Sequence, residues 1–173
     1  MVFIWVTFCT LTVLFFHELG HVLTARLCGI EVERVSIGVG PELTTVRDKR
    51  GTTWRLGLWP IGAYTIYGPA GSRSQKADRE RPSRWAVAMI FAAGIISNLL
   101  LAVLVLLVAW VCGYPVSVAV ALTEPLPGLA LLLSGISILM AICNLLPAPP
   151  LDGWLLARLA LGYECSLTNR ENR

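Results

Sequence analysis

His17, Glu18 and His21 are the residues of this chain whose types and spacing are best suited to chemistry. They lie in an otherwise apolar stretch, and His17 and His21 are the only two histidines in the sequence. On a helix, side chains four residues apart share one face at about 5–6 Å between Cβ atoms, so both imidazoles can point at one ion. This H-E-x-x-H spacing is typical of two zinc ligands with a carboxylate placed beside the metal as general base.

A purely structural alternative is that the two histidines pack inside a helix and bond to their neighbours. We disfavour it, because three ionisable groups in lipid-like surroundings are costly and usually mark a functional site.

Asp152 is the candidate third ligand, since a catalytic zinc site usually has three protein ligands. If both stretches are helical, at 1.5 Å per residue, His21 lies about 7 Å before Arg26 and Asp152 about 9 Å before Arg158. The two groups would therefore reach the same depth from the same side. Three prolines just before Asp152 would break the helix there and let the carboxylate turn inward. Asp152 could instead cap the next helix, and both roles are compatible.

The composition indicates a membrane protein with one compact domain, because 55% of the 173 residues are hydrophobic and 14% are charged. The mean hydropathy is +0.68. A membrane span needs about 20 mainly apolar residues, and three runs are candidates: 2–28, 85–112 and 129–146. The net charge of +3 gives no indication of nucleic-acid binding. The five cysteines show no C-x-x-C spacing, so neither a disulfide scaffold nor a cysteine metal site is expected.

The basic residues predict the orientation in the membrane. Eleven of the fourteen Lys and Arg lie within residues 26–84, and the other three are Arg158, Arg170 and Arg173. By the positive-inside rule this side is cytoplasmic and the N-terminus is external. We expect an integral protein of a bacterial or archaeal cytoplasmic membrane, with its site near the cytoplasmic face.

Between the first two runs, residues 30–84 are expected to form a small β region and a basic cytoplasmic loop. Residues 31–37 alternate as in a strand, and 38–41 read as a break. Residues 43–47 and 52–58 predict a hairpin around a turn that contains Gly51. The apolar stretch 58–64 could dip into the membrane or lie on its surface. Residues 71–84 have the composition of a mobile linker.

These elements predict an all-α membrane core of three transmembrane helices. A small membrane-associated β-hairpin region is expected between the first helix and the second. We expect a single domain over residues 1–162, in which a proline-broken extension to 162 follows the third span. Residues 113–128 would turn on the far side of the membrane, and residues 163–173 would form a polar cytoplasmic tail.

Asn98 ends a patch of small residues, 92–98, that would let the second span approach another helix closely. Because this run of 28 residues exceeds the roughly 20 that a span needs, its first turns are expected to project from the membrane and raise Asn98 towards the metal. Alternatively, Asn98 is a hydrogen-bonding contact between helices.

In this order, the motifs resemble the site-2 proteases, which are intramembrane zinc metalloproteases. The resemblance covers about residues 10–160. It rests on H-E-x-x-H in the first run, Gly94 to Asn98 in the second, and Asn144 through Leu151-Asp152-Gly153 in the third. Segments 36–41 and 60–64 are also similar to the family, the latter to its membrane-entering hairpin. Ile95 and Trp154 replace a Pro and a Gly that are frequent in the family, without altering a ligand.

The resemblance implies that His17, His21 and Asp152 bind Zn²⁺ and that Glu18 is the general base. It implies that Asn98 and Asn144 hold the substrate backbone or its oxyanion. The activity implied is cleavage of transmembrane segments of single-pass proteins near the cytoplasmic face. The connection 113–128 is too short for the PDZ domain of many members, so a minimal member without one is expected.

Two other interpretations remain. A membrane-anchored zincin could take Glu42 as its third ligand, although this residue follows a Gly-x-Gly-Pro loop. From another class, the chain could be a catalytically silent membrane protein that binds single-pass partners, against which the intact Glu18 argues.

Overall fold

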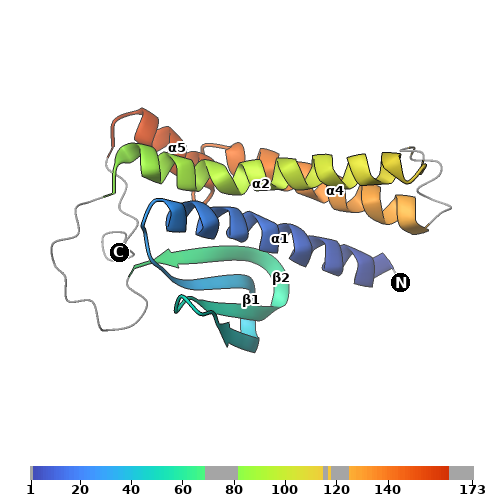
Figure 1. Cartoon of the computed structure of the whole chain (residues 1–173), viewed down its shortest axis with the longest axis horizontal. Coiled ribbons are helices and arrows are strands. Elements are labelled where there is room, and N and C mark those ends of the chain that lie inside the picture. The colour runs from blue at the N-terminus through green and yellow to red at the C-terminus, as the bar shows by residue number, and fades with distance from the viewer. Residues whose placement is uncertain (1, 69–81, 115–116, 118–124, 164–173) are drawn as a thin grey trace.

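The computed structural model describes residues 2–68, 82–114, 117 and 125–163, and these form three layers. The elements follow in the order α1 (Val2–Leu27), β1 (Val32–Arg47), β2 (Thr53–Tyr67), α2 (Arg84–Val111), α4 (Pro125–Leu145) and α5 (Asp152–Ala160). Helix α1 lies between the β1–β2 hairpin on one side and the α2–α4 pair on the other (Figure 1). The helix that carries the two histidines is therefore the central element.

Helix α1 ends where the sequence predicted, at a glycine. Gly29 has φ +73°, a conformation that glycine adopts without strain. Its amide donates to the carbonyl of Arg26, and the next amide, of Ile30, donates to the carbonyl of Ala25. This pair of bonds satisfies helix-end carbonyls and turns the chain back towards α1. The hairpin consequently packs along the helix that precedes it.

The two long strands of the hairpin pair with each other in more than one place. Segment 34–37 pairs with 63–66 on one side and with 53–56 on the other, and 53–56 also pairs with 44–47. Within the described residues, the outer edges of this sheet are therefore 44–47 and 63–67. We call the second of these the edge segment.

The turn predicted at residues 48–51 is confirmed, but the break predicted at 38–41 is wrong, because these residues do not interrupt β1. Residues 58–64, which we expected to dip into the membrane or lie on its surface, belong to β2. Gly38 and Gly40 have φ +76° and +89°, so the strand bends sharply at register shifts without ending. The predicted linker, 71–84, lies almost wholly outside the described residues.

Within the described ranges, three helices are long and apolar enough to cross a membrane: α1, α2 and α4. Helix α2 begins at Arg84, where the Ser83 hydroxyl accepts from the amide of Ala86 as an N-cap. Helix α4 begins at Pro125, four residues before the prediction, because prolines in a first helical turn lose no intrahelical bond. Most of the predicted turn at 113–128 lies outside the described residues.

A small core surrounds α1, and much apolar surface remains outside it. The main cluster joins α1, the hairpin and α2, and its members are Leu14, Val22, Ala25, Val32, Val35, Ile37, Tyr67 and Ile90. In contrast, α2 exposes most of the side chains of Leu100 and Val103. Such an outward apolar face fits contact with lipid rather than water.

Candidate metal centre

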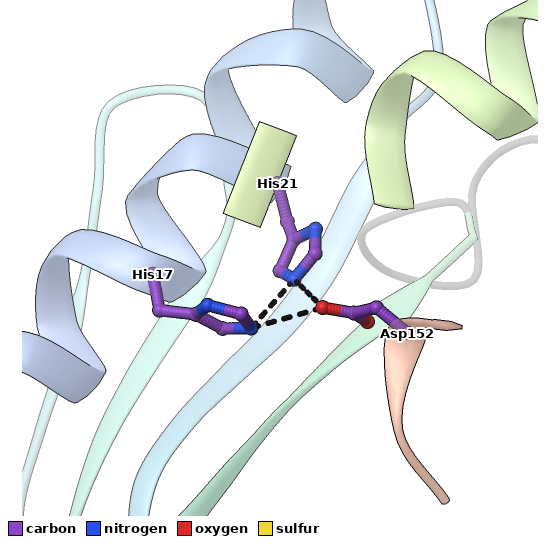
Figure 2. Close-up of side chains that lie close together, drawn as sticks. All are labelled: His17, His21 and Asp152. Carbon is purple, nitrogen blue, oxygen red and sulfur yellow. Dashed lines mark hydrogen bonds and ion pairs between the residues drawn. The ribbon is translucent and has the colours of Figure 1, made fainter. Parts of the chain in front are cut away.

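Three side chains converge between α1 and the start of α5. His17 Nε2 lies 3.1 Å from Asp152 Oδ2, His21 Nε2 lies 3.2 Å from the same oxygen, and the two nitrogens are 3.1 Å apart. Figure 2 shows the two imidazoles and the carboxylate pointing toward one another. Asp152 thus meets the histidine pair, although it lies 131 positions after His21 in the sequence.

The triangle has the dimensions of a metal site. Ligands held at about 2.0–2.1 Å from a tetrahedral zinc are about 3.3 Å apart, close to the three distances here. Asp152 Oδ2 is buried and has no hydrogen-bond partner. Because one proton could serve at most two of the three acceptor atoms, a single cation between them satisfies the group best. The residues therefore fit a divalent metal ion.

The other nitrogen of His21 is held in a way that favours metal binding. Its Nδ1–H donates to the backbone carbonyl of Ile90 on α2 over 2.7 Å. This fixes the tautomer and leaves the lone pair of Nε2 directed at the triangle.

Asn98 contacts His17 at Nδ1, the ring nitrogen that does not face the triangle. Its side-chain amide lies 3.2 Å from His17 Nδ1, and the residue is 0% exposed. For His17 to present a lone pair on Nε2, its Nδ1 must carry the proton and the amide oxygen must accept it. The Asn98 oxygen is a buried atom without a partner, and a half-turn of the amide places it there. Asn98 therefore lies at the level of the histidines, in contact with His17.

Gly94 makes this packing possible. A Cβ atom at this position would lie 2.4 Å from His21 Nε2 and 2.8 Å from His17 Cε1. The patch of small residues in α2 thus does more than let two helices approach, because it also makes room for the imidazole rings.

Helix α5 sets the position of Asp152. Leu151 is the N-cap and makes no side-chain cap bond, so Asp152 is the first helical residue and its carboxylate faces the histidines instead of capping. The Arg84 guanidinium donates to the Leu159 carbonyl at the far end of α5. At the near end, a Cβ on Gly153 would lie 2.3 Å from the Leu145 carbonyl oxygen. Contacts at both ends therefore hold α5 against α2 and α4.

Glu18 is beside the triangle and is bonded to the hairpin. It is 4% exposed and interacts electrostatically with His17, His21 and Asp152. The Thr65 hydroxyl donates to Glu18 Oε2 over 2.6 Å. Thr65 was not identified from the sequence. Its only signal was its position in a strand, where every second side chain points to the same face and could contact α1.

Asn144 and Tyr67 are two further buried polar residues. Asn144 is 6% exposed and donates to the Met140 carbonyl of its own helix over 3.0 Å. Tyr67, also missed from the sequence, is buried near Glu18 and Asp152. Burial, followed by the charge of these two carboxylates, raises the pKa of its phenol, so the phenol stays protonated at neutral pH.

Glu42, the alternative third ligand, lies elsewhere. Its side chain is 52% exposed, 3.4 Å from the Arg55 guanidinium, and accepts a hydrogen bond from Thr45. Among the described residues, the group of His, Cys, Asp and Glu side chains close enough to hold one ion contains His17, His21 and Asp152.

Comparison with known proteins gives one family and several relatives. The family model of peptidase family M50 matches residues 5–126. A protein of Agrobacterium fabrum is 38% identical over 106 residues, 53% of this chain and 28% of its own length. One of Mesorhizobium japonicum is 36% identical over 114 residues, 57% of this chain and 31% of its own. The names of both assign them provisionally to the zinc metalloproteases.

A third relative, named metalloprotease MmpA, is from Caulobacter vibrioides. It is 49% identical over 51 residues, which is 30% of this chain and 13% of the relative. The chain thus spans less than a third of the length of each of these three relatives. The family match also ends before α5, so it does not include Asp152.

Proposed function

Because this chain belongs to peptidase family M50, the site-2 protease family, we propose that it is a zinc-dependent intramembrane endopeptidase. Its substrates would be the transmembrane segments of single-pass proteins, cut near the cytoplasmic face. The observation that carries the proposal is the convergence of His17, His21 and Asp152 within 3.2 Å of one another, next to Glu18.

His17, His21 and Asp152 would hold the zinc ion. When bound, the ion would supply Lewis-acid activation of the attacking water and of the scissile carbonyl. Glu18 would accept the proton of the water and transfer it to the leaving amine. Its burial in the protein keeps it from bulk water, and its hydrogen bond from Thr65 directs one carboxylate oxygen.

The two asparagines would have different tasks. Contact with His17 Nδ1 supports a role for Asn98 in orienting that ligand. Contact with the substrate backbone or its oxyanion remains our prediction for both Asn98 and Asn144. In Asn144 the amide nitrogen is bonded to Met140, which leaves the amide oxygen as the group available to a substrate N–H.

The edge segment would hold the substrate in extended form. A transmembrane helix hides its carbonyls in internal hydrogen bonds, so it must unwind before hydrolysis. Residues 63–67 pair with β1 on one side only within the described part of the chain, and a strand of substrate could add to the other side. Proline substitutions at 64 and 66 should then reduce cleavage in protein that still folds, and normal cleavage would contradict strand addition.

Co-expression with single-pass candidate substrates tests the activity, with wild type compared with Glu18→Gln. The variant keeps the three metal-binding groups and loses the base, so we expect unchanged zinc content and no cleavage. Cleavage by the variant at the wild-type rate would overturn the proposal. A silent protein that only binds single-pass partners would capture substrates equally in both forms and release no fragment from either.

The proposed orientation puts residues 26–84 in the cytoplasm and the N-terminus outside. Support comes from the positions of the basic residues. Cysteine labelling from either side of the membrane, at positions introduced in residues 47–51 and at the N-terminus, tests this arrangement. Labelling of both from the same side would exclude it.

A further inference from the structure

Thr65 is connected to the proposed base by a hydrogen bond between distant parts of the chain. Its hydroxyl donates to Glu18 Oε2 over 2.6 Å, joining the edge segment of β2 to α1. We propose that Thr65 is a positioning residue for Glu18, which links the state of the edge segment to the reactivity of the site. This inference rests on the proposed function, because it assigns the carboxylate the role of general base.

The bond is suited to fixing one orientation of the carboxylate. Glu18 has three rotatable side-chain bonds, and the residue is 4% exposed. A hydroxyl that donates to a carboxylate makes a charge-assisted bond, about twice as strong as a bond between neutral groups. Thr65 is β-branched, so its own side chain has few alternatives. A stiff donor therefore holds a flexible acceptor.

The edge segment places this hydroxyl accurately. Residues 63, 65 and 67 share one face of the strand because successive side chains alternate. Ala63 and Tyr67 both pack with the cluster that contains Leu14 and Val22 of α1. Thr65 lies between these two contacts and pairs with Val35 through its backbone. The packing of Ala63 and Tyr67 therefore fixes the distance between Thr65 and α1.

This arrangement gives the edge segment two tasks. Its inner backbone side pairs with β1, whereas one face of its side chains contacts α1 and the base. A substrate that added to the open side would lie along the strand that holds Glu18. Displacement of the strand would move the donor and release the carboxylate.

The test compares two substitutions of Thr65 in the full-length protein, purified with zinc, acting on a single-pass substrate. Thr65→Val keeps the shape and β-branching and removes the donor, whereas Thr65→Ser keeps the donor. We expect Thr65→Val to lower kcat about 10-fold to 100-fold, with KM within about twofold and unchanged zinc content. Thr65→Ser should recover most of kcat. Thr44→Val, the same change on the exposed opposite edge, should alter neither constant.

Three results would overturn the inference: wild-type kcat in Thr65→Val, failure of Thr65→Ser to recover it, or a rise in KM alone. The last would mean that Thr65 contacts only substrate. These outcomes are distinct from failure of the proposed function, in which Glu18→Gln would also leave cleavage unchanged.

A second readout does not depend on activity. Thermal unfolding of Glu18→Ala, Thr65→Val and the double variant measures the coupling between the two side chains. We expect Thr65→Val to lower the midpoint less in the Glu18→Ala background than in wild type. Additive shifts would mean that the two side chains do not interact, which also overturns the inference.

Discussion

Asp48 and Asp152 both join α1 to a later part of the chain, and Asp48 is surrounded by donors. Its Oδ2 accepts from the Arg26 guanidinium at the end of α1 and from Trp54 Nε1 over 3.3 Å. Its Oδ1 accepts from the backbone amides of Arg50 and Thr52, over 2.9 and 3.0 Å. Partial burial opposes the charge, but these four donors outweigh it and lower the pKa of Asp48 to about 2.

Asp152 has the opposite environment. Its Oδ2 has no hydrogen-bond donor and faces two imidazole nitrogens at 3.1 and 3.2 Å. A carboxylate whose acceptor sites are filled by protein donors has a structural task, whereas one that converges with other acceptors requires an ion. The comparison separates an anchor for the hairpin, at Asp48, from the proposed metal-binding site, at Asp152. Isosteric substitutions can test this difference.

Asp152→Asn should have the largest effect. It replaces an anionic ligand by a neutral amide, so we expect zinc content to fall to near zero and cleavage to fall by at least about 100-fold. Metal analysis of the purified protein and the cleavage assay measure this. Asp48→Asn is the matched control and should retain zinc. Full zinc content in Asp152→Asn would show that the triangle is not the metal site.

Gly94→Ala should disturb the site from the α2 side, where the imidazole rings pack. The added methyl group would lie 2.4 Å from His21 Nε2 and displace that ring, so we expect zinc affinity to fall about 10-fold to 100-fold. Competition with a chelator of known affinity measures the change. Gly135→Ala, in α4, is the control because nothing lies within 4 Å of its added Cβ. It should leave zinc affinity unchanged and stabilise the helix by up to about 1 kcal/mol.

Metal removal should destabilise the protein only when the triangle is intact. Binding to the folded state contributes about 2.7 kcal/mol when free zinc is 100-fold above its Kd. We therefore expect a chelator to lower the thermal midpoint of wild type and to leave that of Asp152→Asn unchanged. Equal shifts in both proteins would indicate zinc bound at another place.

Asp48→Asn should have the smallest effect, a loss of about 1 kcal/mol of stability, because its side chain is 26% exposed and the ion pair is screened. The pKa of Asp48 is lowered from 3.8 to about 2. Its contribution is therefore complete above about pH 5 and is lost as the pH falls through 3.8 towards 2. The difference in midpoint between wild type and Asp48→Asn should be constant from pH 5 to 8 and shrink below pH 4. A difference that grew on acidification would contradict this account.

Several elements could be predicted from local sequence because their signals are local. The apolar lengths of α1 and α2, the glycine after α1 and the turn around Asp48 all match the structure within a few residues. The bent strands were missed because the glycines that end a strand in one context only kink it in another. The N-terminal boundary of α4 was missed because prolines, which usually mark a break, are tolerated in a first turn.

By itself, the sequence determined the chemistry available to the protein: the paired histidines, the glutamate between them and one distant aspartate of suitable depth. Only the tertiary structure decided which atoms meet. The contact of Thr65 with Glu18, the packing of both imidazoles over Gly94 and the outward position of Glu42 depend on how α1, α2 and the hairpin pack. Residue spacing fixes directions along one element, whereas distances between elements follow from the packing of side chains that no local pattern encodes.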